Sequence, residues 1–397
     1  MSPAAEALPA SSYSITNRPP EGREVFPLHL GDTWRLPPAG CRLEDLAAAR
    51  HPDLYRYALP GGLAELVDVL VERARAETGV AVERPNVLVT AGATGGFAAV
   101  LGALVRPGDE VLLLSPRWPL VAGLVKAFGG VPVEVPFHRA AGPEGIPTTA
   151  EEAVSAVTAR TGERTAALYF NSPNNPTGDV LPRSWIEALV EWARREGLWI
   201  LADEAYRDFT YGPSAAASTV AAAEAVDAFG LAPERTFAFR SFSKSFGMAG
   251  NRCGWVMGPL PAMTAALKVA TQLVYSAPTG AQLSALAALT RAEGLEAPGE
   301  AWLKEAREQY RDTGARAAAR LGVAAPLGAT FLFLDVAAEL GGEPLLAFLR
   351  RAADRGLLLS PGTSFGPYPA SIRLCFSAAP PEVVLRGTEL LCELLGR

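Results

Sequence analysis

The sequence has few residues of the kinds that hold metal ions or form disulfides. Its four cysteines are scattered without a paired spacing, and its three histidines form no cluster. A metal site needs several such ligands close together, and a disulfide framework needs cysteines in regular pairs. We therefore expect reduced thiols and no metal site.

Long apolar stretches are also missing. No uninterrupted apolar run of about 18 residues occurs, and the N-terminus has no basic start followed by an apolar core. These absences predict a cytoplasmic protein with no membrane partner. Residues 1–25 are rich in proline, serine and alanine without periodicity, which predicts an N-terminal arm.

The sequence has no block of like charge, and its formal net charge is −6. A nucleic-acid-binding protein carries a basic patch or stripe, so we expect no nucleic-acid partner and a small-molecule ligand instead. With 49% hydrophobic residues in 397, the chain is able to bury more than one core.

What the sequence does contain is a regular alternation of short apolar strands and helices. Such strands are typical of a buried, mainly parallel sheet. We predict an α/β fold: a large domain over 45–270, with a mainly parallel central sheet flanked by helices, and a smaller α+β C-terminal domain formed by 26–44 and 271–397. The predicted strands are 86–90, 110–114, 131–135, 165–169, 198–202, 236–239, 254–258, 331–335, 357–360 and 371–376, and the clearest helices are 61–78, 183–196 and 299–321.

Three segments carry candidate chemistry: YFNSPNNPTG at 169–178, LADEAYRDF at 201–209 and SFSKSFGMAGNRCGW at 241–255. Lys244, in the third segment, follows a predicted strand, where an α/β sheet usually places its ligands. An amine at this position is able to form a Schiff base with an aldehyde cofactor. The segment therefore points to pyridoxal 5'-phosphate.

Pyridoxal phosphate works as an electron sink only while its ring nitrogen is protonated, and a nearby carboxylate secures that charge. Asp203, at the end of a predicted strand, is the candidate carboxylate. Tyr206 and Asn175 are candidates for contact with the phenolic oxygen of the ring. Trp118 is the candidate for stacking on the ring.

The cofactor phosphate needs backbone amides at a helix N-terminus, with hydroxyls and a cation nearby. GATGG at 92–96, between a predicted strand and a helix, supplies the amides. Ser241 and Ser243 offer hydroxyls, and Arg252 offers the cation. Singly, such residues are more often caps, turns or packing residues, so their joint order and spacing carry the prediction.

In this order, NNPTG, DEAY and SFSKSFGMAGNRCGW resemble the three signature segments of the class I and II aminotransferases, within the fold type I pyridoxal-phosphate enzymes. The likeness runs from about His29 to Phe376. It implies transfer of an amino group between an L-amino acid and a 2-oxo acid by a ping-pong mechanism. It also implies a homodimer with shared active sites.

The resemblance assigns roles residue by residue. Lys244 becomes the Schiff-base and proton-transferring lysine, Asp203 the partner of the ring nitrogen, and Tyr206 and Asn175 the partners of the phenolic oxygen. Tyr57, in YALPGGLAEL, becomes the tyrosine that reaches the phosphate in the neighbouring subunit. The remaining assignments are Ala93, Thr94, Ser241, Ser243 and Arg252 to the phosphate, and Gly31, Asn175 and Arg373 to the substrate.

The sequence departs from the family pattern at Thr33–Trp34, where many members have Pro-Asp and an aromatic residue. This departure leaves the substrate side-chain pocket open. A related alternative therefore keeps the cofactor and changes the outcome to elimination, cyclisation or decarboxylation of an amino acid.

Two further alternatives have less support. VLVTAGATGGF is similar to the turn of a nicotinamide-dependent oxidoreductase, but the next predicted strand, 110–114, is followed by Ser115 and not by the acidic residue that holds the ribose. A non-catalytic regulator would need a DNA-binding module, and only about 25 residues precede the enzyme-like region.

Overall fold

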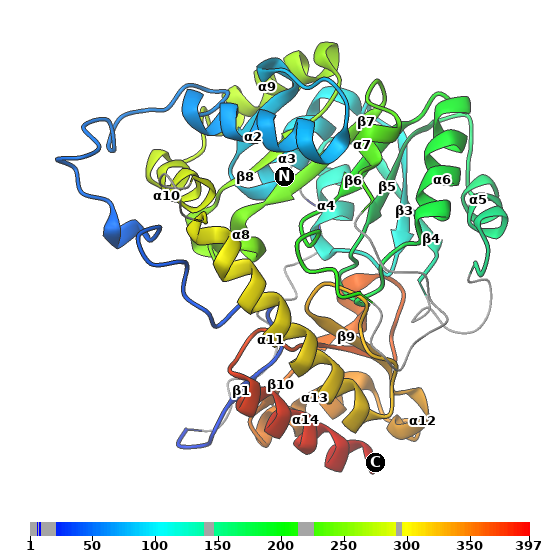
Figure 1. The fold of residues 1–397 in the computed structure, drawn as a ribbon. Coiled ribbons are helices and arrows are strands. Elements are labelled where there is room, and N and C mark those ends of the chain that lie inside the picture. Colours follow the sequence, from blue (N-terminus) through cyan, green and yellow to red (C-terminus); the bar gives the residue numbers. More distant parts are fainter. Residues whose placement is uncertain (1–5, 7, 9–20, 139–146, 213–225, 291–295) are drawn as a thin grey trace.

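The computed structural model describes residues 6, 8, 21–138, 147–212, 226–290 and 296–397. Most of the predicted arm at 1–25 lies outside these residues. In the part of the chain that is described, no helix is both long enough and apolar enough to cross a bilayer. Figure 1 shows a large sheet surrounded by helices, with a smaller layer of strands and helices below it.

The large sheet has seven strands in the order β2-β8-β7-β6-β5-β3-β4. The strand β8 runs antiparallel to both of its neighbours, and every pair from β7 across to β4 is parallel. This confirms the predicted mainly parallel central sheet. The strands are β2 (Val87–Thr90), β3 (Glu110–Ser115), β4 (Val131–Pro136), β5 (Thr165–Asn171), β6 (Trp199–Asp203), β7 (Thr236–Ser241) and β8 (Gly254–Met257).

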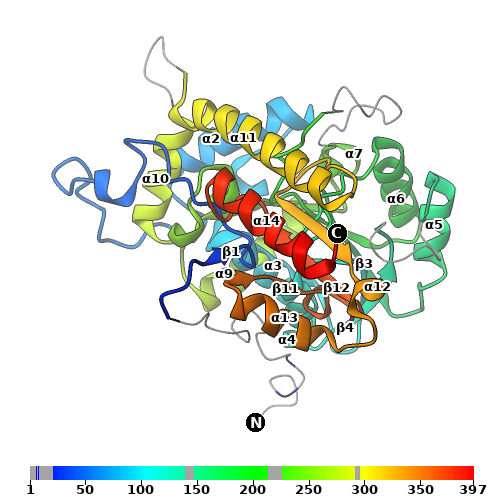
Figure 2. The same cartoon turned by 90° about the horizontal axis from the view of Figure 1, so that it is seen from below.

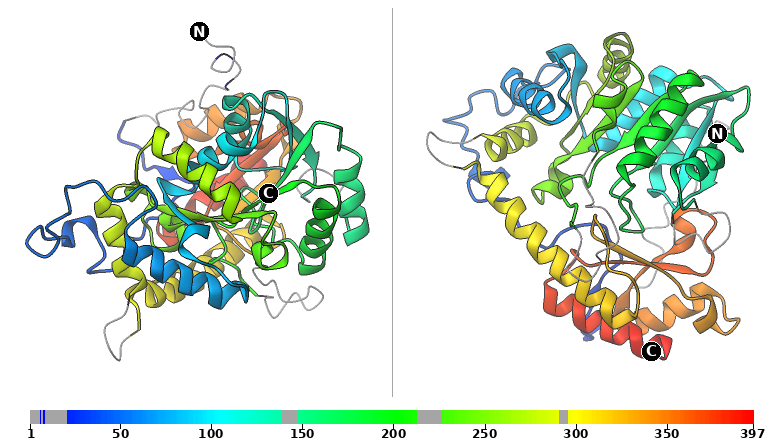
Figure 3. Two further views of the ribbon diagram at one scale, coloured as in Figure 1. Left: turned by 90° about the horizontal axis from the view of Figure 1, so that it is seen from above. Right: turned by 45° about the vertical axis from the view of Figure 1, so that its right-hand side comes forward.

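Successive strand residues face opposite sides of this sheet, so both faces need a helical cover. In β3, Val111 and Leu113 join the core under α3, α4 and α9, whereas Leu112 and Leu114 join the core under α5 and α6. Figure 3 shows the sheet between these helices. The helices around the sheet are α2 (Ala64–Thr78), α3 (Gly92–Leu104), α4 (Pro119–Ala127), α5 (Ala150–Thr158), α6 (Arg183–Arg195), α7 (Ala228–Leu231), α8 (Phe242–Ser245) and α9 (Leu260–Leu273).

The C-terminal part follows α10 (Thr279–Leu289) and α11 (Pro298–Leu321), and α11 runs from the large part to the small one (Figure 1). A three-stranded antiparallel sheet has the order β11-β12-β9. The helices α13 and α14 lie beside it (Figure 2). The elements are β9 (Phe331–Asp335), α12 (Ala337–Leu340), α13 (Leu345–Asp354), β10 (Leu357–Leu358), β11 (Ser360–Pro361), β12 (Ser371–Cys375) and α14 (Pro381–Leu395).

Near the N-terminus, β1 (Phe26–Pro27) pairs in parallel with β10. The segment after β1 is thereby held against the C-terminal part of the chain. The smaller α+β C-terminal part is confirmed, while the exact domain limits at 26–44, 45–270 and 271–397 stay a prediction.

One predicted strand is wrong in its extent. The apolar run at 357–360 forms two separate strands, because Leu357 and Leu358 pair with β1, whereas Ser360 and Pro361 pair with β12. Apolar content alone does not reveal such a change of partner.

Candidate active site

The candidate residues come together because parallel strands end at the same edge of the sheet. Asp203 is the last residue of β6, and Lys244 lies in α8, directly after β7. Asn175 lies in the turn after β5, and α3 begins just after β2. The carboxyl edge of the sheet therefore gathers segments that are far apart in the sequence.

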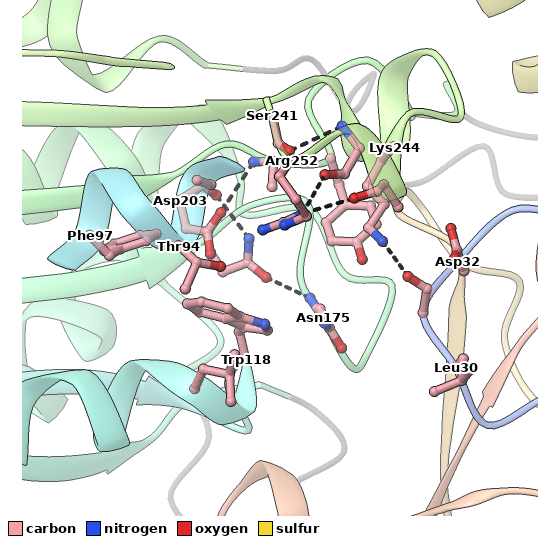
Figure 4. A pocket seen from close by; sticks show the side chains of 18 of the residues that line it. Leu30, Asp32, Thr94, Phe97, Trp118, Asn175, Asp203, Ser241, Lys244 and Arg252 are labelled. Carbon is pink, nitrogen blue, oxygen red and sulfur yellow. Dashed lines mark hydrogen bonds between the residues drawn. The ribbon is translucent and has the colours of Figure 1, made fainter. Parts of the chain in front are cut away.

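These segments enclose a cavity of about 320 Å³. Figure 4 shows its side chains, with Asp203 and Thr94 on one side, Lys244 and Arg252 on another, and Leu30 and Asp32 across from them. The lining contains every predicted site residue except Tyr57: Gly31, Ala93, Thr94, Trp118, Asn175, Asp203, Tyr206, Ser241, Ser243, Lys244, Arg252 and Arg373.

Lys244 extends across the cavity, and its Nζ donates a hydrogen bond to the main-chain carbonyl of Gly31. Burial lowers the pKa of this amine, and the nearby Arg373 and Arg252 act in the same direction. A lowered pKa increases the fraction of neutral amine, which is the nucleophilic and proton-accepting form.

Asp203 is 4% exposed, and burial raises its pKa to about 6. Tyr169 donates a hydrogen bond of 2.9 Å to Oδ2, and the Ala205 amide donates one of 3.2 Å to Oδ1. The side-chain amide of Asn171 donates from Nδ2 to the main-chain carbonyl of Asp203 at 2.8 Å. The carboxylate is therefore fixed in place but lacks a cationic partner among the described residues that contact it, which suits it to a cationic ligand group.

Another part of the cavity is suited to an anion. The N-terminus of α3 lies at the cavity, with Ala93 and Thr94 in the lining, and the Arg252 guanidinium lies beside this N-terminus. A Cβ at Gly92, which has φ of +69°, would lie 2.6 Å from Nη2 of Arg252. Ser241 accepts a hydrogen bond of 3.1 Å from the Ser243 amide and caps α8.

Arg373 is 1% exposed and lies between two aromatic rings, 4.5 Å from the Phe331 centroid and 4.6 Å from the Phe365 centroid. Its Nη1 donates to Asn175 Oδ1 at 2.9 Å, and its Nη2 donates to the His29 carbonyl at 2.6 Å. The rings and hydrogen bonds fix a planar guanidinium at the cavity, where it is suited to a carboxylate.

Aromatic side chains complete the walls. Tyr206 packs edge-on against Phe331 with centroids 5.3 Å apart. Trp118 is tilted against Phe97 at 5.8 Å, and Phe97 stacks on Phe239 at 3.7 Å. Trp118 and Phe97 lie in the cavity lining together with Asp203 and Tyr206, so flat aromatic faces border the space around the carboxylate.

Tyr57 is the predicted site residue that the structure places outside the cavity. Its side chain is 87% exposed, and its ring contacts Tyr275 with centroids 5.1 Å apart. The prediction concerned the cavity of a neighbouring subunit, so its role stays a prediction.

The sequence reasoning missed several residues around the site. Tyr169 and Asn171 hold Asp203, and Phe97 and Asp32 line the cavity. Asn171 and Asp203 are paired residues at the ends of the neighbouring strands β5 and β6. This register follows from the packed sheet, and the sequence alone carried no signal for it.

The departure at Thr33–Trp34 also has a structural account. Thr33 shares a short hydrogen bond between its hydroxyl and that of Tyr310, and the Trp34 amide donates to the Ser377 carbonyl at 3.0 Å. Trp34 is 40% exposed and does not line the cavity. The residues of this segment that do line the cavity are Leu30, Gly31 and Asp32.

Comparisons with known proteins agree with the fold and the cavity. A family model for aminotransferase class I and II matches residues 30–389. The aspartate/prephenate aminotransferase of Thermus thermophilus is 33% identical over 86% of this chain and 84% of its own. The arginine–pyruvate transaminase of Pseudomonas aeruginosa is 31% identical over 97% of this chain and 94% of its own.

Solved structures give the same answer. Aspartate aminotransferase from Thermus thermophilus with maleate has a TM-score of 0.85 and 28% sequence identity, covering 99% of both chains. The match includes the GATGG turn, so the oxidoreductase alternative loses its support. The chain is an enzyme that transfers amino groups between amino acids and 2-oxo acids, and it belongs to the class I and II aminotransferases.

Proposed function

We propose that the chain performs this transfer in the cavity described above, with pyridoxal 5'-phosphate carried on Lys244. The observation that carries the proposal is the convergence of a buried amine, a buried carboxylate and an anion-binding helix terminus on one cavity. Each of these groups is suited to bind a different part of one ligand.

The residues present fit this cofactor. Asp203, whose pKa is raised by burial, gains a favourable partner from a protonated ring nitrogen. The α3 N-terminus and Arg252 are suited to the phosphate, and Ser241 and Ser243 add hydroxyls. Tyr206 and Asn175 lie on the cavity wall for the phenolic oxygen, and Trp118 offers a face to the ring. When bound, pyridoxal phosphate would supply an electron sink for the substrate α-carbon.

The protein groups move and hold protons around that carbon. Lys244 Nζ accepts the proton of the amino-acid α-carbon, since its lowered pKa favours the neutral amine, and would pass it to the carbonyl-derived carbon of the bound cofactor. With the 2-oxo acid it would move a proton in the reverse direction, to the α-carbon. Tyr169 stays protonated, because burial and the adjacent Asp203 raise its pKa, and it therefore keeps donating to the carboxylate. Asp203 in turn holds the proton of the ring nitrogen.

Arg373 binds the α-carboxylate of the amino acid and of the 2-oxo acid. Its guanidinium is held by Asn175, His29 and two rings, so little side-chain entropy is lost when a substrate binds. Because both substrates carry this carboxylate, one arginine serves both halves of a ping-pong reaction.

The proposal includes a homodimer. Several large apolar side chains near Tyr57 are exposed, which is typical of a protein interface. They lie in the extended segment before α2 and at the end of α9: Leu43, Tyr55, Tyr57, Leu59, Leu273, Val274 and Tyr275. A second copy of the chain would cover them and bring its Tyr57 to the phosphate end of the cavity.

Absorption spectroscopy tests the cofactor and the reaction together. Wild-type protein and Lys244→Ala are loaded with pyridoxal phosphate and dialysed, and their visible spectra are recorded with and without amino acids. The panel includes aspartate and arginine, which are named in the descriptions of two relatives. Lys244→Arg is the matched control, because it keeps a long cationic side chain without a Schiff-base-forming amine.

We expect a visible band in the wild type alone, bleaching by some amino acids, and formation of the matching 2-oxo acid. A wild type that retains no cofactor would contradict the proposal. Release of ammonia or a cyclic product without an amino acceptor would instead support elimination or cyclisation.

A further inference from the structure

A cluster of five charged residues, two of them buried and three partly buried, lies next to the cavity without lining it. We call it the charge cluster: Glu77, Glu204, Arg207, Asp227 and Arg240. Glu204 and Arg240 are each 4% exposed. Glu77 comes from α2, Arg240 from β7, and Asp227 caps α7, so the cluster joins segments that are distant in sequence.

The two arginines share the same carboxylate oxygens. Arg240 donates from Nε to Glu204 Oε2 at 3.0 Å and from Nη2 to Asp227 Oδ2 at 2.7 Å, and its Nη1 binds Glu77. Arg207 donates from Nη1 to the same Glu204 and Asp227 oxygens at 2.8 and 3.2 Å. Such shared bonds fix angles as well as distances, because the guanidinium groups are planar.

The cluster is adjacent in sequence to two groups that line the cavity. Glu204 follows Asp203, and Arg240 precedes Ser241. Successive residues of an extended chain point in opposite directions, so one side chain faces the cavity while its neighbour enters the cluster. The positions of Asp203 and Ser241 are therefore tied to each other through the Glu204–Arg240 bond.

A third cavity residue is tied to the cluster indirectly. Ser245, which follows Lys244, donates from its hydroxyl to Asp208 Oδ2 at 2.6 Å. The other Asp208 oxygen is 3.3 Å from Arg73, which binds Glu77 of the cluster at 2.8 Å. The short helix α8 that carries Lys244 is thereby held against the same group of charges.

Stability alone does not account for this arrangement. Burying several charges costs free energy in desolvation, and well-packed apolar residues often stabilise a protein as well or better. What the shared guanidinium–carboxylate bonds add is a constraint on angles between specific groups of different segments. Site groups depend on such supporting contacts to stay within a fraction of an ångström of their working positions.

We propose that the charge cluster is a positioning device for the cofactor site, which sets the distances among Asp203, Ser241 and Lys244. The cluster does not touch the cofactor or the substrate. Its residues act through neighbours in the sequence: Asp203, proposed for the ring nitrogen, Ser241, proposed for the phosphate, and Lys244, which supplies the amine. This inference rests on the proposed function.

Glu204→Gln is the sharpest test, because it keeps the size of the side chain and removes the charge that Arg207 and Arg240 share. We measure the rate at which pyridoxal phosphate leaves the loaded protein, and the pH at which its visible band changes. We expect dissociation about tenfold to a hundredfold faster, as for other supporting contacts around a bound group, with a shifted spectral transition.

Two further variants separate positioning from loss of folding. Ser245→Ala removes the bond from α8 to Asp208, together with the longer bond of 3.3 Å from the same hydroxyl to the Ser241 carbonyl. We expect it to shift the spectral transition with a smaller effect on dissociation. Leu189 lies in α6, is fully buried in the core between α6 and the sheet, and takes no part in the ion pairs of the cluster. Leu189→Ala should therefore lower the thermal midpoint by leaving a cavity in this core. We expect it to leave the spectral transition and dissociation rate unchanged.

The outcomes separate the two proposals. A wild type that binds no pyridoxal phosphate overturns both. A wild type that binds it, while Ser245→Ala and any folded Glu204→Gln match it in spectrum and dissociation rate, overturns only the positioning role. The same result follows if Leu189→Ala shifts the spectrum as far as they do, because general destabilisation would then explain the effect.

Discussion

Asp203 shows how the requirements of folding and of function differ at a single residue. Its carboxyl group is buried, and its pKa of about 6 lies above its ordinary value of 3.8. Between these two pH values the folded chain holds a proton that the unfolded chain releases. Stability therefore falls as the pH rises through this range, and the full cost of the buried charge is present above pH 6.

We predict that Asp203→Asn stabilises the cofactor-free protein at pH 7.5. The amide cannot ionise, so the variant avoids a cost of at most ~3 kcal/mol. Its oxygen can still accept from the Ala205 amide, and its nitrogen can donate to the Tyr169 hydroxyl, in place of the present bonds. Thermal unfolding of the cofactor-free proteins at pH 7.5 and below about pH 3, under both pKa values of the carboxyl group, measures the difference.

The advantage should disappear at the lower pH, where the wild-type carboxyl group is protonated in both states. With pyridoxal phosphate present the order should reverse, because only the carboxylate pairs with a protonated ring nitrogen. A variant that is less stable than the wild type at pH 7.5 without cofactor would contradict this account.

At the scale of the element, the start of α3 depends on one residue that has no side chain. Gly92 has φ of +69°, and its Cα lies against the Arg252 guanidinium. We predict that Gly92→Ala costs about 1–2 kcal/mol in backbone strain. It should also displace Arg252 from the anion-binding end.

Comparison of two ligands measures this effect. Affinity for pyridoxal phosphate should fall, while affinity for pyridoxal, which has no phosphate, should change little. Gly250→Ala is the matched control, since a Cβ at Gly250 meets no atom within 4 Å. An equal loss for both ligands would show that Gly92 does not act through the phosphate.

Elements were the most predictable level of the structure. Apart from the edge strand β4, the strands of the large sheet are buried on both faces, so most of them are short apolar runs that the sequence displays directly. Short elements were harder. The strands β10 and β11 were predicted as one, because the change from pairing with β1 to pairing with β12 depends on segments more than ten residues away.

The candidate site divides in the same way. Residues inside signature segments, such as Lys244 and Asp203, could be predicted because their spacing is local. The contacts that hold them could not be predicted. Tyr169 bonds Asp203 from the neighbouring strand, and Glu77 bonds Arg240, which is 163 positions away in the sequence. Such pairs depend on the packed fold, which a single sequence does not display.

At the scale of the whole molecule, the proposed dimer makes a prediction about mixtures. Tyr57→Ala should weaken cofactor binding in the neighbouring subunit, and Lys244→Ala should abolish activity in its own subunit. In a hybrid dimer, the site that keeps Lys244 receives an intact Tyr57 from the other chain. Half of the randomly formed dimers are hybrids with one intact site of two, so the mixture should regain about a quarter of wild-type activity.

The measurement is activity after the two purified variants are unfolded together and refolded, compared with each variant treated alone. Activity no higher than the average of the separate samples would show that Tyr57 serves its own subunit or neither. Light scattering on the wild type supplies the control, because a monomer at assay concentration would remove the basis for sharing.

The contact between Lys244 and Gly31 has a consequence for how this site can change over generations. The acceptor is a main-chain carbonyl, which every amino acid carries, so no codon at position 31 removes it. A Cβ there would, however, lie 3.0 Å from the Phe331 ring, and that ring also stacks on Arg373. Changes at positions 31 and 331 are therefore coupled: a side chain at 31 requires the Phe331 ring to give by a few tenths of an ångström, and that movement alters the packing of Arg373.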